Sequence, residues 1–414
     1  MPSAIYSLPR VYTHRSPAAD LHLTLRLRGA EERDQPEEHT PAAPRAFRKG
    51  TLTVTPVLDD TRMGGGLRAP FGAEVEGVDW TQPVPEEVIE QLKGLQDEYA
   101  VLIFRKTGLD NARHVAFSQQ LGQRLEINPF FYGREQDRIG DPYLWDVSNI
   151  NRDGTLVKPN SRRWHHSLGN ALWHTPAVCA SALSLRMIVR MRLVIILMIS
   201  LMTLLRQDSS YHQERSKYSL LLSHGKPVRG GSWTHFADTR QAYEDLPQSM
   251  KDMLEDLVVE HDLWHSRRLG SPTTFKEPLP HERAAKPPAY HKLVQQAPGG
   301  GRKTLFLAAH ARLILGWSLE ASQKLLWDLI EWCTQPKYVF SMEWLDGGDM
   351  VWWDNRQSMH RANPYTESMT ARDVRRTTVI DDGPFAWGVT EQERTAAAEQ
   401  ARESGVRQWE LPLQ

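Results

Sequence analysis

The sequence has few of the features that mark several large protein classes. Its 414 residues include only two cysteines, Cys179 and Cys333. Two cysteines give no disulfide framework and suit a reducing compartment, so we expect a cytoplasmic protein. The opening residues lack the apolar stretch of a secretory signal. A formal net charge of −1 gives no basis for expecting nucleic acid or an anionic membrane surface as a partner.

Several catalytic motifs are also absent. The chain has no Gly-rich phosphate-binding loop, no Cys-x-x-Cys pair and no Gly-x-Ser-x-Gly elbow. Its strand-like runs are short, and helical patterns lie mainly before and around them rather than alternating with them. This arrangement predicts a mainly β protein with flanking helices, of the α+β class, with an antiparallel core rather than a parallel nucleotide-binding sheet.

The chain divides by composition into three parts. Residues 1–48 are rich in Pro, Arg and Glu and predict a disordered leader. Residues 49–390 carry the apolar patterns of a folded domain, and residues 391–414 predict a polar helical tail. Within the domain, residues 270–302 are rich in Pro, Gly and Lys and predict a long active-site loop. The clearest helical patterns cover residues 83–98, 109–121 and 319–333.

One block inside the domain differs in composition from the rest. Residues 176–207 contain no Asp, Glu, Gly, Phe, Tyr or Trp, although the average composition would place about 4 acidic residues there. The longest apolar run of the block, residues 193–205, is 13 residues long and is interrupted only by Ser200 and Thr203. A bilayer span needs roughly 20 apolar residues. We therefore do not expect the block to cross a membrane.

The two ends of this block resemble halves of one metal-binding turn. His174-Thr175 precedes it and Asp208 follows it, so the chain without the block would contain a His-x-Asp turn. Residues two apart on an extended segment point to the same side, so both side chains could reach one ion. A third ligand must come from a distant strand, and His360 is the candidate. Two His and one carboxylate on one face of a metal are typical of non-haem Fe(II) oxygenases.

Further segments occur in the order found in one known family. They are Gly72-Ala-Glu-Val, Gly169-Asn-Ala-Leu-Trp-His-Thr, Asp208-Ser-Ser-Tyr, Ala237-Asp-Thr-Arg-Gln-Ala-Tyr, Gly348-Asp-Met-Val-Trp-Trp-Asp-Asn-Arg, Met359-His-Arg-Ala and Arg375-Arg-Thr-Thr. With them the chain, from about residue 52 to residue 388, resembles the taurine / 2,4-dichlorophenoxyacetate dioxygenase (TauD/TfdA) family. The resemblance is nearer to the aryloxyacetate branch. It implies a double-stranded β-helix (jelly-roll) core that works with Fe(II), 2-oxoglutarate and O2.

The resemblance also implies roles for individual residues. His174, Asp208 and His360 would be the iron ligands. Arg376 would pair with the distal carboxylate of 2-oxoglutarate in the bidentate manner that arginine favours, and Thr234 would hydrogen-bond the same cosubstrate. Arg372 would face the cosubstrate or the anionic end of a substrate, with a merely solvated side chain as the alternative. The implied reaction converts 2-oxoglutarate to succinate and CO2 while hydroxylating a small organic acid.

The block between His174 and Asp208 leaves three explanations open. It is a tolerated loop in an active enzyme, or it disrupts the metal site and leaves a catalytically impaired relative that acts as a binding or membrane-associated protein. In the third explanation the block is translated noncoding sequence, and the working protein lacks it. We favour the third, because the flanks rejoin as the family motif. The sequence leaves open whether the protein forms a homo-oligomer.

Overall fold

The computed structural model describes residues 46–58, 69–128, 138–158, 161, 210–225, 233–270, 275–362 and 371–409. The chain divides into a unit of residues 1–43 and a unit of residues 44–414, and every described residue belongs to the second unit. The first strand begins at Phe47, before the expected end of the leader at residue 48. The block 176–207, together with His174 and Asp208, lies outside the described residues.

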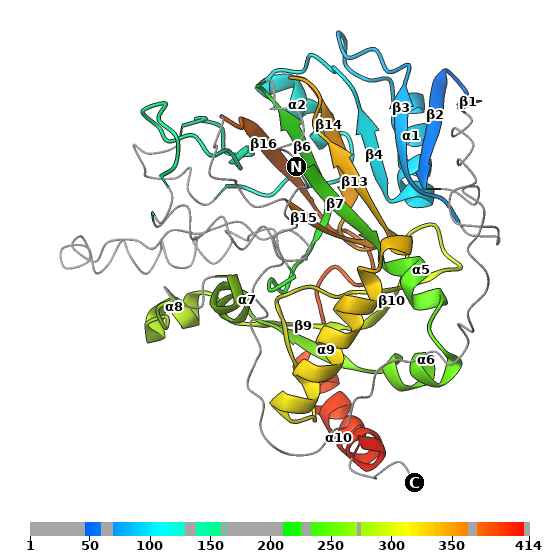
Figure 1. Ribbon diagram of the computed structural model, residues 1–414, viewed down its shortest axis with the longest axis vertical. Helices are drawn as coiled ribbons and strands as arrows, with labels where there is room; N and C mark the ends of the chain where they lie inside the picture. The colour runs from blue at the N-terminus through cyan, green and yellow to red at the C-terminus, as the bar shows by residue number, and fades with distance from the viewer. Residues whose placement is uncertain are drawn as a thin grey trace, which may run out of the picture. The chain divides into compact units, whose positions relative to one another are not determined.

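The core of the domain is one large sheet (Figure 1). Its neighbouring strands are antiparallel, except that β3 and β4 are parallel. In spatial order the strands are β1 (Phe47–Lys49), β2 (Leu52–Leu58), β3 (Phe71–Glu76), β4 (Val101–Phe104), β14 (Met350–Asp354), β6 (Ser216–Ser223), β16 (Val374–Ile380) and β5 (Trp145–Asp146). The strands β14, β6 and β16, from the second half of the chain, therefore lie together between β4 and β5, from the first half.

A second, three-stranded sheet faces the inner side of the large one. It consists of β13 (Val339–Glu343), β7 (Trp233–Asp238) and β15 (Ser358–Ala362), all antiparallel. The two sheets share one apolar cluster, to which both contribute buried side chains: Phe71, Ala100, Val101, Ile103, Leu221, Phe236, Phe340, Met342, Trp344, Val351, Trp353 and Val374. Two mainly antiparallel sheets around one core form the jelly-roll that the sequence predicted.

Helices cover the outer side of the large sheet. The helix α1 (Glu86–Tyr99) packs against β3, β4 and β14, and α2 (Asn111–Gln119) packs against β16. Asp110 caps α2, because its side chain accepts a hydrogen bond from the backbone N–H of Arg113 at 2.9 Å. Both helices were predicted from apolar spacing, and their buried residues form a second apolar cluster with the outward side chains of the sheet.

Two smaller sheets and further helices complete the described fold. One sheet contains β12 (Ala311–Ile314), β8 (Val258–His261) and β9 (Ala289–Lys292), and the other contains β10 (Val294–Gln296) and β11 (Lys303–Leu305). The helices are α5 (Thr239–Glu244), α6 (Gln248–Leu254), α7 (Leu263–Gly270), α8 (Pro280–Ala285), α9 (Leu319–Cys333) and α10 (Glu391–Trp409), with a short 3-10 turn at Pro336–Tyr338. Throughout residues 46–409, as far as they are described, no helix is long and apolar enough to cross a membrane.

The expectation of a long loop over residues 270–302 was wrong. The described part of that range contains α8, β9 and β10, and β9 pairs with β8 while β10 pairs with β11. Proline and glycine do punctuate this range, but they separate short elements instead of preventing them. Strands of three or four residues give too short an apolar pattern to be recognised before their partners are known.

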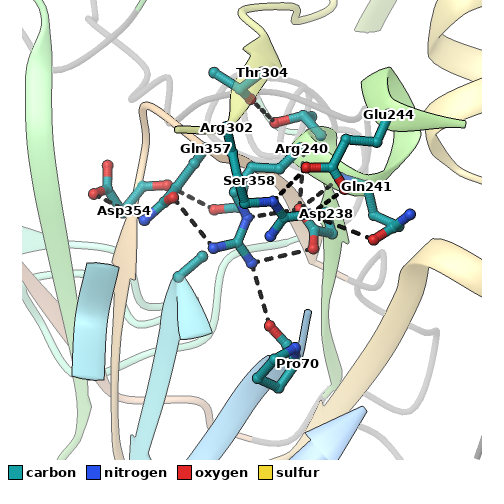
Figure 2. Close-up of polar contacts among 12 residues, drawn as sticks. Pro70, Asp238, Arg240, Gln241, Glu244, Arg302, Thr304, Asp354, Gln357 and Ser358 are labelled. Carbon is teal, nitrogen blue, oxygen red and sulfur yellow. Dashed lines mark hydrogen bonds and ion pairs between the residues drawn. The ribbon is translucent and has the colours of Figure 1, made fainter. Parts of the chain in front are cut away.

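A buried ion pair fastens the end of β7 to its surroundings (Figure 2). The Arg240 guanidinium bonds to the Asp238 carboxylate, with Nε at 2.9 Å and Nη2 at 3.1 Å. It also donates to the backbone carbonyl of Glu98 at 3.0 Å and to the side-chain oxygen of Gln357 at 3.3 Å. A further contact reaches the carbonyl of Pro70 at 3.4 Å. One arginine thereby links the end of α1, the approach to β3 and the turn before β15.

Candidate active site

The registers of β7 and β15 turn two candidate residues toward the space between the sheets. His360 lies directly opposite Phe236, and Thr234 lies directly opposite Met342. Opposite residues of an antiparallel pair share a face, and both Phe236 and Met342 belong to the inter-sheet cluster. His360 and Thr234 are diagonal neighbours on this face, because Thr234 lies two residues from Phe236, the partner of His360.

Arg376 reaches the same space from the large sheet. It lies opposite Leu221 of the inter-sheet cluster, its side chain is 4% exposed, and its guanidinium carbon is 5.5 Å from the centre of a Trp145 ring. Its neighbour Arg375 points the other way, because side chains alternate along a strand. Arg375 donates to Asn111 of α2 at 2.6 Å. Strand geometry thus distinguishes two adjacent arginines.

The imidazole of His360 is held by aromatic packing. Its ring centre is 4.6 Å from that of Trp353 and 6.1 Å from that of Phe236, and the side chain is 7% exposed. A ligand whose rotamer is fixed by its neighbours meets a metal without further ordering. Across the described ranges no three His, Cys, Asp or Glu residues form a group that could hold a metal. The other two expected ligands, His174 and Asp208, lie outside those ranges.

Thr234 and Arg372 are connected by one tryptophan. The indole N–H of Trp344 donates to the Thr234 hydroxyl at 3.0 Å, and the Arg372 guanidinium carbon is 5.9 Å from the centre of the same indole ring. The Arg372 backbone N–H donates to the Asn149 side chain at 2.7 Å. Arg372 is therefore packed against the residues of the site.

An ion-pair network holds the first residues of β16. Asp373 accepts hydrogen bonds from Arg138 at 2.7 Å and from Arg375 at 3.1 Å, and Arg138 also binds Asp146 of β5. Partial burial raises the pKa of the Asp373 carboxyl, but the hydrogen bonds from the two arginines outweigh this effect and bring the pKa to about 2. The network joins β5 to the segment that carries Arg372 and Arg376.

The depressed pKa of Asp373 predicts a loss of stability in acid. A carboxyl with a lower pKa in the folded state stabilises the fold fully above its ordinary pKa, and this stabilisation is lost as the pH falls through about 2. Replacing Asp373 with Asn should therefore lower the free energy of unfolding at pH 6 by roughly 2 kcal/mol and change it less at pH 3. Urea unfolding at the two pH values measures this difference, and an equal loss at both would contradict the prediction.

Ser210 anchors the chain two residues after Asp208, a feature that the sequence did not reveal. Its hydroxyl lies 2.9 Å from Nδ1 of His261 and 3.3 Å from Nδ1 of His310. Burial, with a further effect from His291 and His310, lowers the pKa of His261 well below its ordinary value, so this ring is neutral. Ser210 occurs in a recognised motif, but the two histidines are far from it in sequence and carry no local signal.

The described residues include an imidazole, a hydroxyl and a guanidinium on the inner face of a jelly-roll, as the resemblance to the non-haem iron oxygenases that use 2-oxoglutarate implies. The model of the taurine catabolism dioxygenase TauD, TfdA family matches residues 61–180 and 198–378, which is well over half of the sequence. The chain therefore belongs to the TauD/TfdA family. The unmatched residues 181–197 lie within the block 176–207. The family and the dioxygenase class predicted from the motifs are confirmed.

Relatives with names and solved structures agree with this assignment. The alpha-ketoglutarate-dependent 2,4-dichlorophenoxyacetate dioxygenase of Cupriavidus pinatubonensis is 32% identical over 316 residues, which cover 76% of this chain and 96% of that protein. The (S)-phenoxypropionate/alpha-ketoglutarate-dioxygenase of Sphingobium herbicidovorans is 28% identical and is covered to 88%, against 72% of this chain. The crystal structure of AAD-2 with Mn(II) and N-oxalylglycine has a TM-score of 0.63 and 31% identity, and covers 82% of this chain and 100% of that one.

The described donors fit the groups that this family uses. Alpha-ketoglutarate is another name for 2-oxoglutarate, a dicarboxylate whose oxygens only accept hydrogen bonds. Arg376 and Thr234 offer a guanidinium and a hydroxyl on the inner face, both nearly enclosed by protein at 4% and 2% exposure. His360 offers the imidazole that suits iron. Fe(II), 2-oxoglutarate and O2 are accordingly the cofactor and cosubstrates of this enzyme class, as expected from the sequence.

Proposed function

We propose that the protein hydroxylates a small, anionic organic substrate and releases succinate and CO2. The observation that carries the proposal is the common orientation of His360, Thr234 and Arg376 toward the space between the two sheets. Three residues from three strands, chosen by their motifs, thereby face one interior. Because successive side chains of a strand point to opposite faces, about half of a set of randomly chosen strand residues would face outward.

The proposed roles follow from the chemistry of each side chain. His174, Asp208 and His360 would hold Fe(II), which with O2 and 2-oxoglutarate supplies the oxidation of a substrate C–H bond. Arg376 would bind the distal carboxylate of 2-oxoglutarate, and its burial strengthens that contact because little water competes. Trp145 would keep water from the guanidinium, and Trp353 would hold the His360 ring in one orientation.

The substrate class is proposed from the relatives and from Arg372. The named relatives act on a phenoxyacetate and a phenoxypropionate, both of which are aryloxy carboxylates. Arg372 lies against Trp344 beside Thr234, so a second cation is present at this end of the site. A guanidinium against an aromatic face suits an anion attached to an apolar group. We therefore propose an aryloxyalkanoate or a similar organic anion as the substrate.

The block 176–207 provides the first test of this proposal. We expect the chain without the block to release succinate from 2-oxoglutarate about 100-fold faster than the full chain, since a displacement of 1 Å at a catalytic site can have an effect of that size. Succinate release with Fe(II) and a panel of aryloxyalkanoates measures the rates. Equal activity of the two forms would identify the block as a tolerated loop. Activity in the shortened form alone would locate the defect in the block, and a native protein that contains the block would then be the alternative, a catalytically impaired relative with a binding or membrane-associated role. No activity in either form would contradict the proposed function.

Peptide mapping of the native protein tests the origin of the block independently. We expect no peptides from within residues 176–207, because the two flanks join as a His-x-Asp turn when the block is removed. Abundant peptides from within these residues would show that the working protein contains them.

The two adjacent arginines of β16 provide a second test. Replacing Arg376 with Lys should raise the KM for 2-oxoglutarate roughly 10- to 100-fold, because lysine cannot make the bidentate contact with a carboxylate. The matched control is Arg375→Lys, since Arg375 faces α2 on the other side of the same strand. Steady-state kinetics in both variants should show the change in KM only for Arg376. Equal effects would contradict the assignment.

A further inference from the structure

Trp344 occupies the inner wall of the site, although the motifs assign it no role. It follows the last residue of β13, its side chain is 1% exposed, and it belongs to the inter-sheet apolar cluster. Its indole N–H donates to the Thr234 hydroxyl at 3.0 Å. Buried tryptophans generally find an acceptor for the indole N–H. Here the acceptor is the hydroxyl of Thr234, a residue that is expected to bind the cosubstrate.

This hydrogen bond determines what the Thr234 hydroxyl can do. A hydroxyl has one proton to donate and two lone pairs that accept, whereas an indole N–H can only donate. Thr234 therefore accepts from Trp344 and keeps its own proton for another partner. Carboxylate oxygens accept hydrogen bonds and never donate them when ionised. The indole thus prepares Thr234 as a donor toward an anion in the space between the sheets.

The face of the same indole supports Arg372. The guanidinium carbon is 5.9 Å from the ring centre, within the range of a cation–π contact. The backbone of Arg372 is held separately, because its N–H donates to Asn149 and its carbonyl accepts from the Asn149 N–H at 3.3 Å. One side chain therefore contacts both a hydroxyl on β7 and a cation just before β16, on two different sheets.

We propose that Trp344 is a positioning residue for the carboxylate end of the cosubstrate. It orients the Thr234 hydroxyl as a donor through its N–H and keeps Arg372 at the same end of the site through its ring face. This inference rests on the proposed function, because it takes 2-oxoglutarate as the bound anion. It adds a residue that acts through Thr234 and does not itself need to touch the cosubstrate.

Binding of 2-oxoglutarate in the presence of Mn(II), measured by calorimetry, tests the inference without turnover. Trp344→Phe keeps an aromatic ring and removes the N–H donor. It should raise the dissociation constant of 2-oxoglutarate about fivefold, and Thr234→Val should raise it about tenfold. Because the indole acts through the hydroxyl, the double variant should bind within about twofold of Thr234→Val alone.

Trp332→Phe is the matched control. Trp332 is also buried and donates its indole N–H to a backbone oxygen, that of Ala242, at 2.8 Å. It lies on α9, outside the inter-sheet cluster, so its replacement should leave the dissociation constant unchanged. Thermal unfolding of all variants reports any general loss of stability.

Three outcomes decide between the possibilities. An unchanged dissociation constant in Trp344→Phe, with normal binding by the unsubstituted chain, would overturn the role of Trp344 and leave the proposed function intact. Additive effects of the two substitutions would also overturn it, because the indole would then act independently of Thr234. No binding of 2-oxoglutarate by the unsubstituted protein, either as the full chain or as the chain without residues 176–207, would overturn the proposed function and this inference together.

Discussion

Replacing His360 with Ala should lower the rate of succinate release by more than about 100-fold, since even residues that only support a metal ligand are worth 10- to 100-fold. His360 is the described member of the proposed iron-binding set, and it faces the interior between the sheets. The affinity of the His360→Ala variant for Fe(II) or Mn(II) should fall in parallel. The fold should persist, because the rings of Trp353 and Phe236 still pack against each other when the imidazole is removed. Succinate release and metal binding on the same preparations measure the two effects.

His235 is the control for this experiment. It lies on β7 next to Phe236, the residue opposite His360, and it is itself opposite Arg361. Its Nδ1 lies 2.6 Å from the Ser341 hydroxyl. Since His235 lies on the outer face of the small sheet, His235→Ala should leave both rate and metal affinity within about threefold of the parent. Activity within tenfold of the parent in His360→Ala would show that this imidazole is not an iron ligand.

Replacing Arg240 with Met should destabilise the domain by about 3–5 kcal/mol, the usual effect of leaving one partner of a buried ion pair without the other. Both side chains of the Arg240–Asp238 pair are almost completely enclosed, at 1% and 3% exposure. Figure 2 shows the guanidinium surrounded by its acceptors, among them the carbonyl of Pro70 and the side chain of Gln357. The substitution leaves these oxygens and the Asp238 carboxylate with fewer donors in a region from which water is excluded.

Urea unfolding measures this loss, and an exposed pair provides the comparison. Arg113 and Asp110 form an ion pair at 3.1 Å on the surface of α2, with both side chains substantially exposed. Arg113→Met should cost less than about 1 kcal/mol, because solvent screens a surface pair. The Asp238→Asn, Arg240→Met double variant should recover part of the loss, since no unpaired charge remains. A loss below about 1 kcal/mol in Arg240→Met would contradict a supporting role for the pair.

Much of the local structure could be predicted from the sequence, because the interactions that determine it are local. The helix predicted over 319–333 is α9 with the same bounds, and its N-terminus is capped by Ser318, whose hydroxyl accepts from the Ala321 N–H at 3.2 Å. Asp110 likewise marks the start of α2. Capping and helical periodicity involve residues within one or two turns, so one stretch of sequence contains the whole signal.

The short elements after α7 could not be predicted from the sequence, because the interactions that hold them are not local. The strands β9 and β10 have four and three residues and are held by pairing with β8 and β11. Their own residues include few apolar positions and follow many prolines and glycines. Such strands exist because a partner strand satisfies their backbone groups, and the partner is not visible in the strand itself.

The sequence by itself determined the family and supplied the candidate ligands, since motif order depends on neighbours along the chain. Only the tertiary structure decided that Arg376 faces the interior while Arg375 binds α2, and that Trp344 joins Thr234 to Arg372. These facts depend on strand register and on contacts between residues more than 100 positions apart, such as Thr234 and Trp344. Pairing between strands that are distant in sequence determines where a side chain lies, whereas the local sequence determines only which side chain it is.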